Sequence, residues 1–538
     1  MPAPIGSYAA LIAWLELEHE GFYSSLVCRD VPGAGRGMFV SRDIPGGETM
    51  LEIPSSALLN PLTLRISPLN TIPAHLFPCT NADRAVVPVK RRRQSLTATR
   101  LDTTQLLTLH LLLSRDPEGR HQSAWKAYIA TLPDFEGWHP LTWVASGGEG
   151  VEELLGCLPV EAREKLEDVR KRYEADCEVL KGVLRVEDPF AEQNLLGVLC
   201  ETDFLWAWLN VNTRTVSIPL DIPGVSSLQN HTLVPVLDML NHTSQSSSQI
   251  PNPRQYPSSP SIASIPRSRH SAPTAPNGTS VVPSGPKPRG LVRDVGPLIP
   301  GKIGFRLIAP HKGLSAGDEV LFEYGSHSSA TLFAEYGFVE GPYASESVKS
   351  DMNDGLAGVR VRRAPTGWLE KEHGCVDVGD LIREIWAGRG MDDAESEEKE
   401  DALRALSCFS RHVIHTTPSP PHPSHSLLML LRALHLPPHS TKLASIRAGR
   451  ICYISPTNEQ AALDSLEAVC STARSRAVEG VQRVKALRQR SVGAAVGVGS
   501  GPERLDGWVW DGLEGMWEEE REVLSAVLGR IERRETDW

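Results

Sequence analysis

Residues 33–54 read GAGRGMFVSRDIPGGETMLEIP, and this stretch sets the character of the N-terminal part of the chain. Apolar runs at Met38–Val40 and Thr49–Ile53 predict two strands around a Pro45-Gly46-Gly47 turn. The glycines of Gly33–Gly37 let the backbone approach a ligand closely. The loop is not a Walker sequence, since no Lys-Ser/Thr pair follows, and a dinucleotide loop would lead into a helix instead of a strand. A ligand-binding turn and a plain tight turn both fit it.

Length and composition limit the class of protein. The chain has 538 residues, of which 41% are hydrophobic and 22% charged, so several globular domains are expected. A net charge of −11 argues against a surface built to hold nucleic acid. Nine scattered cysteines without a CxxC pair predict reduced, intracellular thiols and no zinc cluster. Neither a secretory leader nor an apolar run of about 18 residues is visible, so we expect no export and no membrane span.

The pattern of the chain changes several times beyond this stretch. Residues 102–213 are mostly helical in pattern, and the pattern is helical again after residue 345. Between these parts, residues 244–288 contain 12 serines and 10 prolines in 45 positions. Such a segment cannot bury enough apolar surface to offset its ordering entropy, so the sequence predicts disorder there.

Polar side chains follow an apolar run at Asp238, Asn241 and His242. Buried polar groups need partners, so the simplest interpretation is a cluster that fixes a loop. Asp238 and His242 could be metal ligands, but no third ligand stands at a suitable spacing, and we expect no metal. Arg214 ends an aromatic helical stretch and either clamps a carboxylate or lies on the surface.

Two Tyr-Gly pairs stand twelve residues apart, at Tyr324-Gly325 and at Tyr336-Gly337-Phe338. The first follows Gly317-Asp318-Glu319-Val320, a predicted strand entry, so its phenol would lie where the backbone turns. Taken alone, two structural tyrosines beside turns explain these pairs equally well.

The order of these motifs is more informative than any one of them. A GxGRGMF loop, a helical block, an Arg, an Asp-x-x-Asn-His, then GDEV–YG and YGF resembles the SET-domain methyltransferases. More narrowly, the chain resembles the Rubisco large-subunit methyltransferase-like branch, which includes fungal enzymes that methylate ribosomal proteins and cytochrome c. Residues 124–143 (AWKAYIATLPDFEGWHPLTW) look like the start of that branch's helical insertion.

The resemblance implies an α+β protein with two domains. A SET catalytic domain of short strands would occupy residues 1–345, with a mainly helical insertion over about 60–230 and the disordered insertion at 244–288. An all-helical substrate-binding domain would occupy residues 346–538.

The resemblance also implies an enzyme that transfers a methyl group from S-adenosylmethionine to a lysine side chain. Tyr324 matches the tyrosine at the methyl-transfer centre, and Tyr336 matches a second tyrosine that lines the lysine channel. The residues that match the cofactor-binding positions are Arg36, Gly37, Met38, Arg214, Asp238, Asn241 and His242. One departure is Ser328-Ser329, where the family usually has Ser-Asn.

Without flanking zinc clusters, a non-histone protein substrate is favoured, for example a ribosomal protein or cytochrome c. The YGF at 336–338 favours lysine, because the branch that methylates actin histidine departs from it. Two alternatives stay open, namely a protein-histidine methyltransferase on the same fold and a catalytically silent SET-fold binding module. We further expect a monomer in the cytoplasm, the nucleus or both, which binds neither nucleic acid nor membrane directly.

Overall fold

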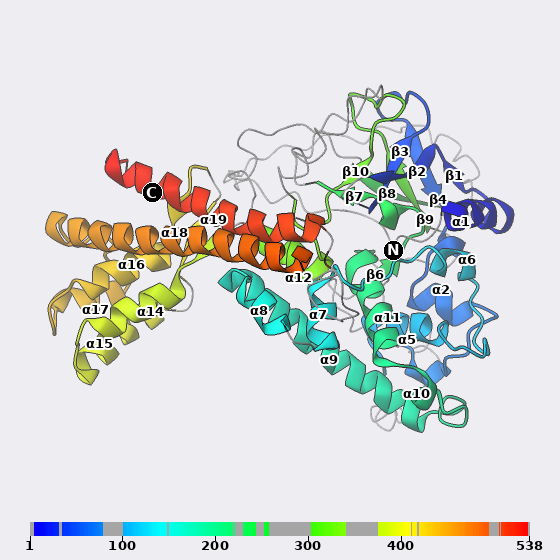
Figure 1. Ribbon diagram of the computed structural model, residues 1–538, viewed down its shortest axis with the longest axis horizontal. Coiled ribbons are helices and arrows are strands. Elements are labelled where there is room, and N and C mark those ends of the chain that lie inside the picture. The colour runs from blue at the N-terminus through cyan, green and yellow to red at the C-terminus, as the bar shows by residue number, and fades with distance from the viewer. Residues whose placement is uncertain are drawn as a thin grey trace, which may run out of the picture.

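The computed structural model places most of the chain. It describes residues 5–31, 35–78, 100–147, 150–218, 220, 230–243, 252–257, 303–325, 327–340, 375–409, 412–416, 419–493, 505, 507–535 and 538. Most of the short strands gather at one end of the molecule, and two long helices, α18 (Pro456–Gly493) and α19 (Gly507–Glu532), run from its middle toward the other end (Figure 1).

The N-terminal strands build small antiparallel sheets. A four-stranded sheet has the order β1 (Tyr23–Ser24), β4 (Thr49–Ile53), β9 (Ile303–Ile308) and β8 (Asn252–Pro257). The predicted strand at 49–53 is confirmed, and the one predicted at 38–40 begins earlier, in a hairpin of β2 (Leu26–Val31) and β3 (Gly35–Val40). The expected α+β class with short strands is therefore present.

Two further pairs of strands bring distant parts of the chain together. In the parallel pair of β7 (Asn241–His242) and β10 (Leu321–Phe322), Asn241 is in register with Leu321. The antiparallel pair consists of β5 (Thr215–Ser217) and β6 (His231–Leu233). The first pair places the Asn-His motif next to the strand that leads into Tyr324.

Helices fill the predicted insertion and pack on these strands. Some of them begin where a polar side chain caps free N–H groups, as at Asp102, whose side chain accepts from the Gln105 N–H at 2.8 Å. One short helix, α12 (Ser329–Tyr336), follows β10, and α1 (Ile5–Glu18) is the first described helix. The α-helices that the structure describes between residues 60 and 215 are α2 (Pro61–Ile66), α5 (Thr103–Leu113), α6 (Lys126–Ile129), α7 (Pro140–Ser146), α8 (Val151–Gly156), α9 (Val160–Val186), α10 (Leu195–Val198) and α11 (Glu201–Arg214).

The C-terminal part is helical, as predicted, with three short strands added. These form the sheet β11 (Cys375–Asp377), β12 (Val413–His415) and β13 (His422–Pro423). The helices here are α14 (Gly379–Gly388), α15 (Asp393–Ala405), α16 (His425–Leu434), α17 (Thr441–Arg447) and the long pair α18 and α19.

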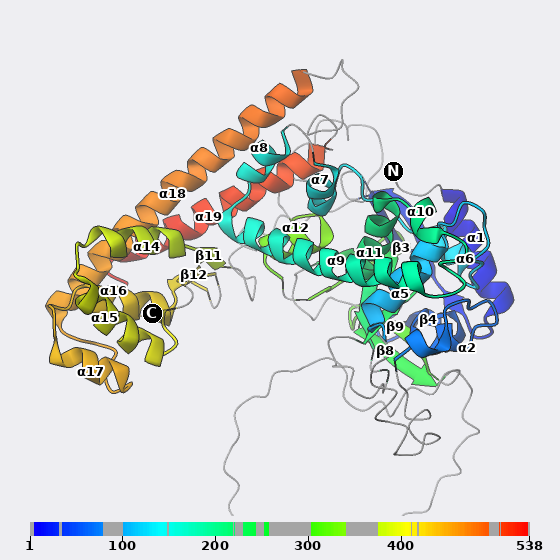
Figure 2. The same cartoon turned by 90° about the horizontal axis from the view of Figure 1, so that it is seen from below.

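The long helix pair joins two hydrophobic cores. Figure 2 shows α18 and α19 lying side by side along the molecule. One part of the pair, with Ala477 and Trp517, belongs to the large N-terminal core, and the other, with Leu466 and Leu524, belongs to the C-terminal core. Gly480 permits the close approach, because a Cβ there would lie 2.3 Å from the Trp517 ring.

The prediction for residues 244–288 needs a correction at one place. Asn252–Pro257 form β8, which pairs with β9 from Asn252–Ile308 to Pro257–Ile303. Composition did not reveal this strand because its hydrogen-bond partners come from β9, which lies beyond the Ser/Pro-rich segment. The remainder of 244–288 and the predicted domain boundary at 345/346 lie outside the described residues.

Among the helices that the structure describes, none combines the length and apolar character needed to cross a membrane.

Candidate active site

The glycine-rich strand, the Asn-His motif and the GDEV segment meet at one point. Asn241 Nδ2 donates to Glu319 Oε1 at 2.7 Å. A Cβ on Gly37 would lie 2.5 Å from that carboxylate oxygen and 3.1 Å from Asn241 Nδ2. A glycine is therefore required at position 37 because any side chain there would collide with Glu319 and Asn241. Burial raises the pKa of Glu319, and the hydrogen bond from Asn241 opposes that rise.

A buried ion pair joins the end of α11 to the turn before β7. Arg214 Nη1 donates to Asp238 Oδ2 at 3.2 Å and to the Asp238 carbonyl at 2.9 Å. The Tyr128 hydroxyl, from α6, donates to the same Oδ2 at 2.8 Å. Burial raises the pKa of Asp238, whereas Arg214 lowers it. Asp238 thus braces the loop, as the simplest interpretation of this polar cluster predicts.

Three buried polar atoms at this position lack a hydrogen-bond partner among the described residues. They are Arg36 Nη1, Arg214 Nε and Asp238 Oδ1. Arg36 uses Nη2 to donate to the Thr131 carbonyl at 2.8 Å. Burial lowers the pKa of Arg36, and the nearby charge of Arg214 lowers it further. Two guanidinium groups beside one carboxylate leave a surplus positive charge, which suits a carboxylate-bearing ligand.

Tyr324 lies directly after β10 and is fixed from two sides. Its hydroxyl donates to the Leu240 carbonyl at 2.6 Å, and its backbone N–H donates to His242 Nδ1 at 3.2 Å. The His242 ring centroid lies 5.1 Å from that of Tyr324. Burial raises the pKa of Tyr324 well above its ordinary value, so the phenol is neutral at physiological pH.

An aromatic group surrounds Tyr324. The ring centroid of Tyr336, the last residue of α12, lies 5.2 Å from that of Tyr324, and Phe338 lies 6.2 Å from both. Burial raises the pKa of Tyr336 to about 12. Ser328 caps α12 by accepting from the Thr331 N–H at 3.2 Å, so the departure at Ser328-Ser329 leaves this helix start intact. The two predicted catalytic tyrosines therefore belong to one aromatic cluster.

The structure brings together the residues that the sequence selected. Arg36, Gly37 and Met38 lie on β3, Arg214 ends α11, Asp238 lies in the turn before β7, and Asn241 and His242 form β7. Met38 is fully buried, and its carbonyl accepts from the Val320 N–H at 2.7 Å. Their individual roles toward a cofactor stay predictions. No group of three His, Cys, Asp or Glu that could hold a metal is found in the described part of the chain.

Sequence reasoning did not select three contributors, namely Tyr128, Glu319 and the Leu240 carbonyl. Tyr128 stands within the quoted 124–143 stretch and Glu319 within the quoted GDEV segment, but neither received a role. The carbonyl carries no side-chain signal. All three became recognisable only through contacts that join distant parts of the chain.

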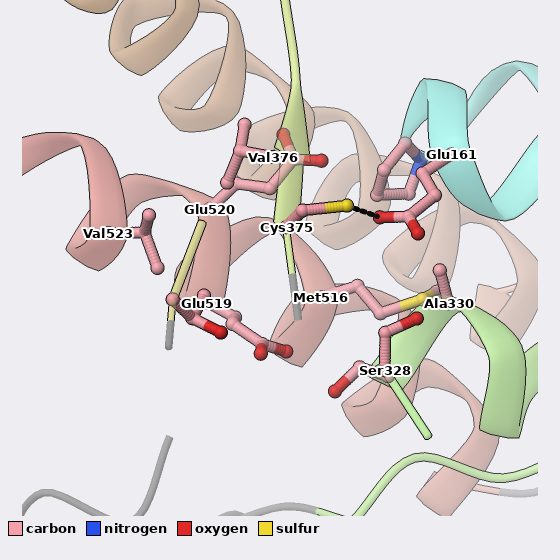
Figure 3. Close-up of a pocket in the computed structure, with 12 residues that line it drawn as sticks. Glu161, Ser328, Ala330, Cys375, Val376, Met516, Glu519, Glu520 and Val523 are labelled. Carbon is pink, nitrogen blue, oxygen red and sulfur yellow. Dashed lines mark hydrogen bonds between the residues drawn. The ribbon is translucent and has the colours of Figure 1, made fainter. Parts of the chain in front are cut away.

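An acidic pocket lies at the N-terminal end of α12 (Figure 3). Glu161 of α9 and Glu519 and Glu520 of α19 line it beside Ser328 and Cys375. The Cys375 thiol donates to Glu161 Oε2 at 3.6 Å. Burial, together with the charges of Glu161 and Glu519, raises the pKa of Glu520 from 4.5 to about 8.

We predict that Glu520→Gln stabilises the protein at high pH. The unfolded chain releases this proton near its ordinary pKa, whereas the folded protein holds it until about pH 8. The folded state binds more protons between these values, so stability from this group falls as pH rises through that window. Thermal unfolding should show a higher Tm for the variant than for wild type at pH 8.5 and a smaller difference at pH 5. A difference independent of pH would contradict the assigned titration.

Comparisons with known proteins agree with this architecture. No protein-family model matches the chain. A mouse relative, SET domain-containing protein 4, is 26% identical over 238 residues, covering 44% of this chain and 47% of its own length. Fission yeast ribosomal lysine N-methyltransferase set11 is 20% identical over 61% of this chain and 60% of its own. Budding yeast ribosomal lysine N-methyltransferase 2 is 23% identical over 62% and 70%. The chain spans about half the length of the first curated relatives that it matches.

Solved structures give the same result for the fold. The SET domain of LSMT bound to lysine and AdoHcy superposes with a TM-score of 0.53 at 16% identity, over 99% of this chain and 92% of that one. Rubisco LSMT bound to AdoMet gives 0.51 at 16% identity, over 98% and 92%. The chain therefore has the SET fold with a helical C-terminal part, and its predicted resemblance to the Rubisco large-subunit methyltransferase-like branch is confirmed.

Proposed function

We propose that this chain is an S-adenosylmethionine-dependent protein-lysine N-methyltransferase that acts on a non-histone protein. One observation carries the proposal. A pair of arginines with unfilled hydrogen-bonding positions and an aromatic cluster of Tyr324, Tyr336 and Phe338 both contact the loop of residues 238–242. A methyl donor that carries a carboxylate would thus bind next to the apolar channel that admits the methyl acceptor. The ligands named in the LSMT and Rubisco LSMT structures support the choice of cofactor.

The residues present fit this cofactor. Arg36 and Arg214 offer N–H groups for its carboxylate, and Asp238 Oδ1 offers an acceptor for its amino group. Asn241 and His242, with the backbone around Gly37 and Met38, would complete the site. When bound, the cofactor supplies a methyl group on a sulfonium sulfur. The protein contributes the position of that group and the exclusion of water.

The aromatic cluster around Tyr324 suits a lysine side chain as the methyl acceptor. A lysine amine reacts only when neutral, although its ordinary pKa is about 10.4. The apolar chamber beside a sulfonium charge disfavours the ammonium form, so the proton leaves to solvent as the side chain enters. Tyr324 is not the base, because burial raises its pKa. Its hydroxyl donates to the Leu240 carbonyl, which leaves the oxygen lone pairs free to orient the amine and contact the methyl group through CH···O interactions.

We propose a ribosomal protein as the substrate, supported by the names of the two yeast relatives. Cytochrome c stays a prediction from the sequence resemblance. The negative net charge fits a basic partner of either kind. We also propose that the helical C-terminal part is the substrate-binding domain. The protein is further proposed to be a monomer in the cytoplasm, the nucleus or both.

The test is incubation with tritiated S-adenosylmethionine and, separately, ribosomal proteins or unmethylated cytochrome c, followed by tandem mass spectrometry of labelled peptides. We expect methyl groups on lysine and loss of label when that lysine is replaced by arginine. Label that survives the replacement and maps to histidine would favour the protein-histidine methyltransferase. Cofactor binding without label in any fraction of a whole lysate would favour the silent binding module.

A further inference from the structure

The residue before Tyr336 is held by two helices of the insertion. Arg172 of α9 donates from Nη2 to Glu335 Oε1 at 2.5 Å. Asn212 of α11 donates from Nδ2 to Glu335 Oε2 at 3.1 Å and lies 3.4 Å from the Glu335 carbonyl. Arg172 Nη1 also donates to Asn212 Oδ1 at 3.2 Å, which closes the three side chains into one network.

A buried histidine holds the same backbone position from a third element. His139, at the start of α7, donates from Nε2 to the Glu335 carbonyl at 3.1 Å, and its Nδ1 accepts from the Leu141 N–H at 3.2 Å. His139 is fully buried, and burial lowers its pKa to about 4. The neutral ring with its proton on Nε2 satisfies both contacts at physiological pH.

The backbone after Tyr336 is fixed by packing. Gly337 ends α12 with φ +81°, and a Cβ there would lie 3.0 Å from the Trp138 ring and 3.1 Å from His139. The insertion therefore binds the Glu335 carbonyl before Tyr336 and packs closely against Gly337 after it.

We propose that Arg172, Asn212 and His139 are positioning residues that act through Glu335 to hold the Tyr336 ring against Tyr324. The inference rests on the proposed function and names a role for the helical insertion in it. Arg172 is 49% exposed, and such a pair adds little to stability. The effect on the reaction rate can be much larger than the effect on stability. When a group that aligns the reactants shifts by only a fraction of an ångström, the rate falls strongly.

The test is a double-mutant cycle with Arg172→Gln and Glu335→Gln, assayed by tritium transfer to ribosomal proteins. Arg170→Gln is the matched control, since Arg170 lies on the same helix and, among the described residues, pairs with Glu167 and Glu174 of that helix. We expect each variant of the network to lower kcat about fivefold or more with the KM for S-adenosylmethionine within about twofold. The double variant should lose no more than the worse single variant.

A change in Tm without a change in kcat, or a kcat equal to that of Arg170→Gln, would overturn the positioning role in an otherwise active enzyme. Additive losses in the double variant would also overturn it, because the two residues would then act separately. A wild-type protein that transfers no methyl group would instead overturn the proposed function, so the two failures are distinct.

Discussion

Tyr324→Phe should lower the rate of methyl transfer at least about tenfold while the affinity for S-adenosylmethionine changes little. The substitution keeps the ring that packs on His242 and Tyr336 and removes only the hydroxyl bonded to the Leu240 carbonyl. That hydroxyl is the polar group that orients the acceptor amine in the proposed chamber. Single-turnover transfer and equilibrium binding of the cofactor, measured on the same preparation, separate the two effects.

Tyr173→Phe is the matched control for this prediction. Tyr173 is also a buried tyrosine, but it lies on α9, where its hydroxyl contacts Cys177 at 4.0 Å. Its loss should leave transfer unchanged. Equal losses of transfer and cofactor affinity in Tyr324→Phe would show that Tyr324 supports the structure of the site and takes no part in transfer.

Asp238→Ala should be the most destabilising substitution in the site and should also abolish cofactor binding. The Asp238 side chain is 1% exposed and neutralises Arg214, with Arg36 close by. Its removal leaves buried guanidinium charges without a counter-charge and the Tyr128 hydroxyl without its acceptor. Breaking a buried pair in this way costs about 3–5 kcal/mol. Denaturant unfolding monitored by circular dichroism measures the loss.

Asp134→Ala provides the comparison on an exposed pair. Asp134 is 63% exposed and lies 3.1 Å from Arg115, so its loss should cost less than about 1 kcal/mol. A similar, small cost for Asp238→Ala would mean that water or other groups compensate the arginines. The buried ion pair would then not be a determinant of the site.

The sequence was sufficient to predict the local elements of the site. The GRGMF strand, the Asn-His turn and the two Tyr-Gly pairs each carry a local signal, since glycines, turns and strand ends depend on neighbouring residues. Their order along the chain then predicted the SET fold, which the structural comparison confirms.

Contacts between residues far apart in the sequence could not be predicted from such local signals. Tyr128 reaches Asp238 across 110 residues, and Arg172 reaches Glu335 across 163. A side chain's partner at that separation is set by how the helical insertion packs on the strands, which no local pattern encodes. The same reason explains β8, whose strand state depends on pairing with β9 and not on its own composition.

In the proposed function, Arg36–Met38, Arg214, Asp238–His242 and Tyr324 together bind one molecule of cofactor. Equilibrium dialysis of the full chain against tritiated S-adenosylmethionine measures this binding. We predict saturable binding of one cofactor per chain, competed by S-adenosylhomocysteine and lost in an Arg36→Ala/Arg214→Ala variant that keeps its circular dichroism spectrum. No binding to the wild-type chain, or unchanged binding to the folded double variant, would contradict the account.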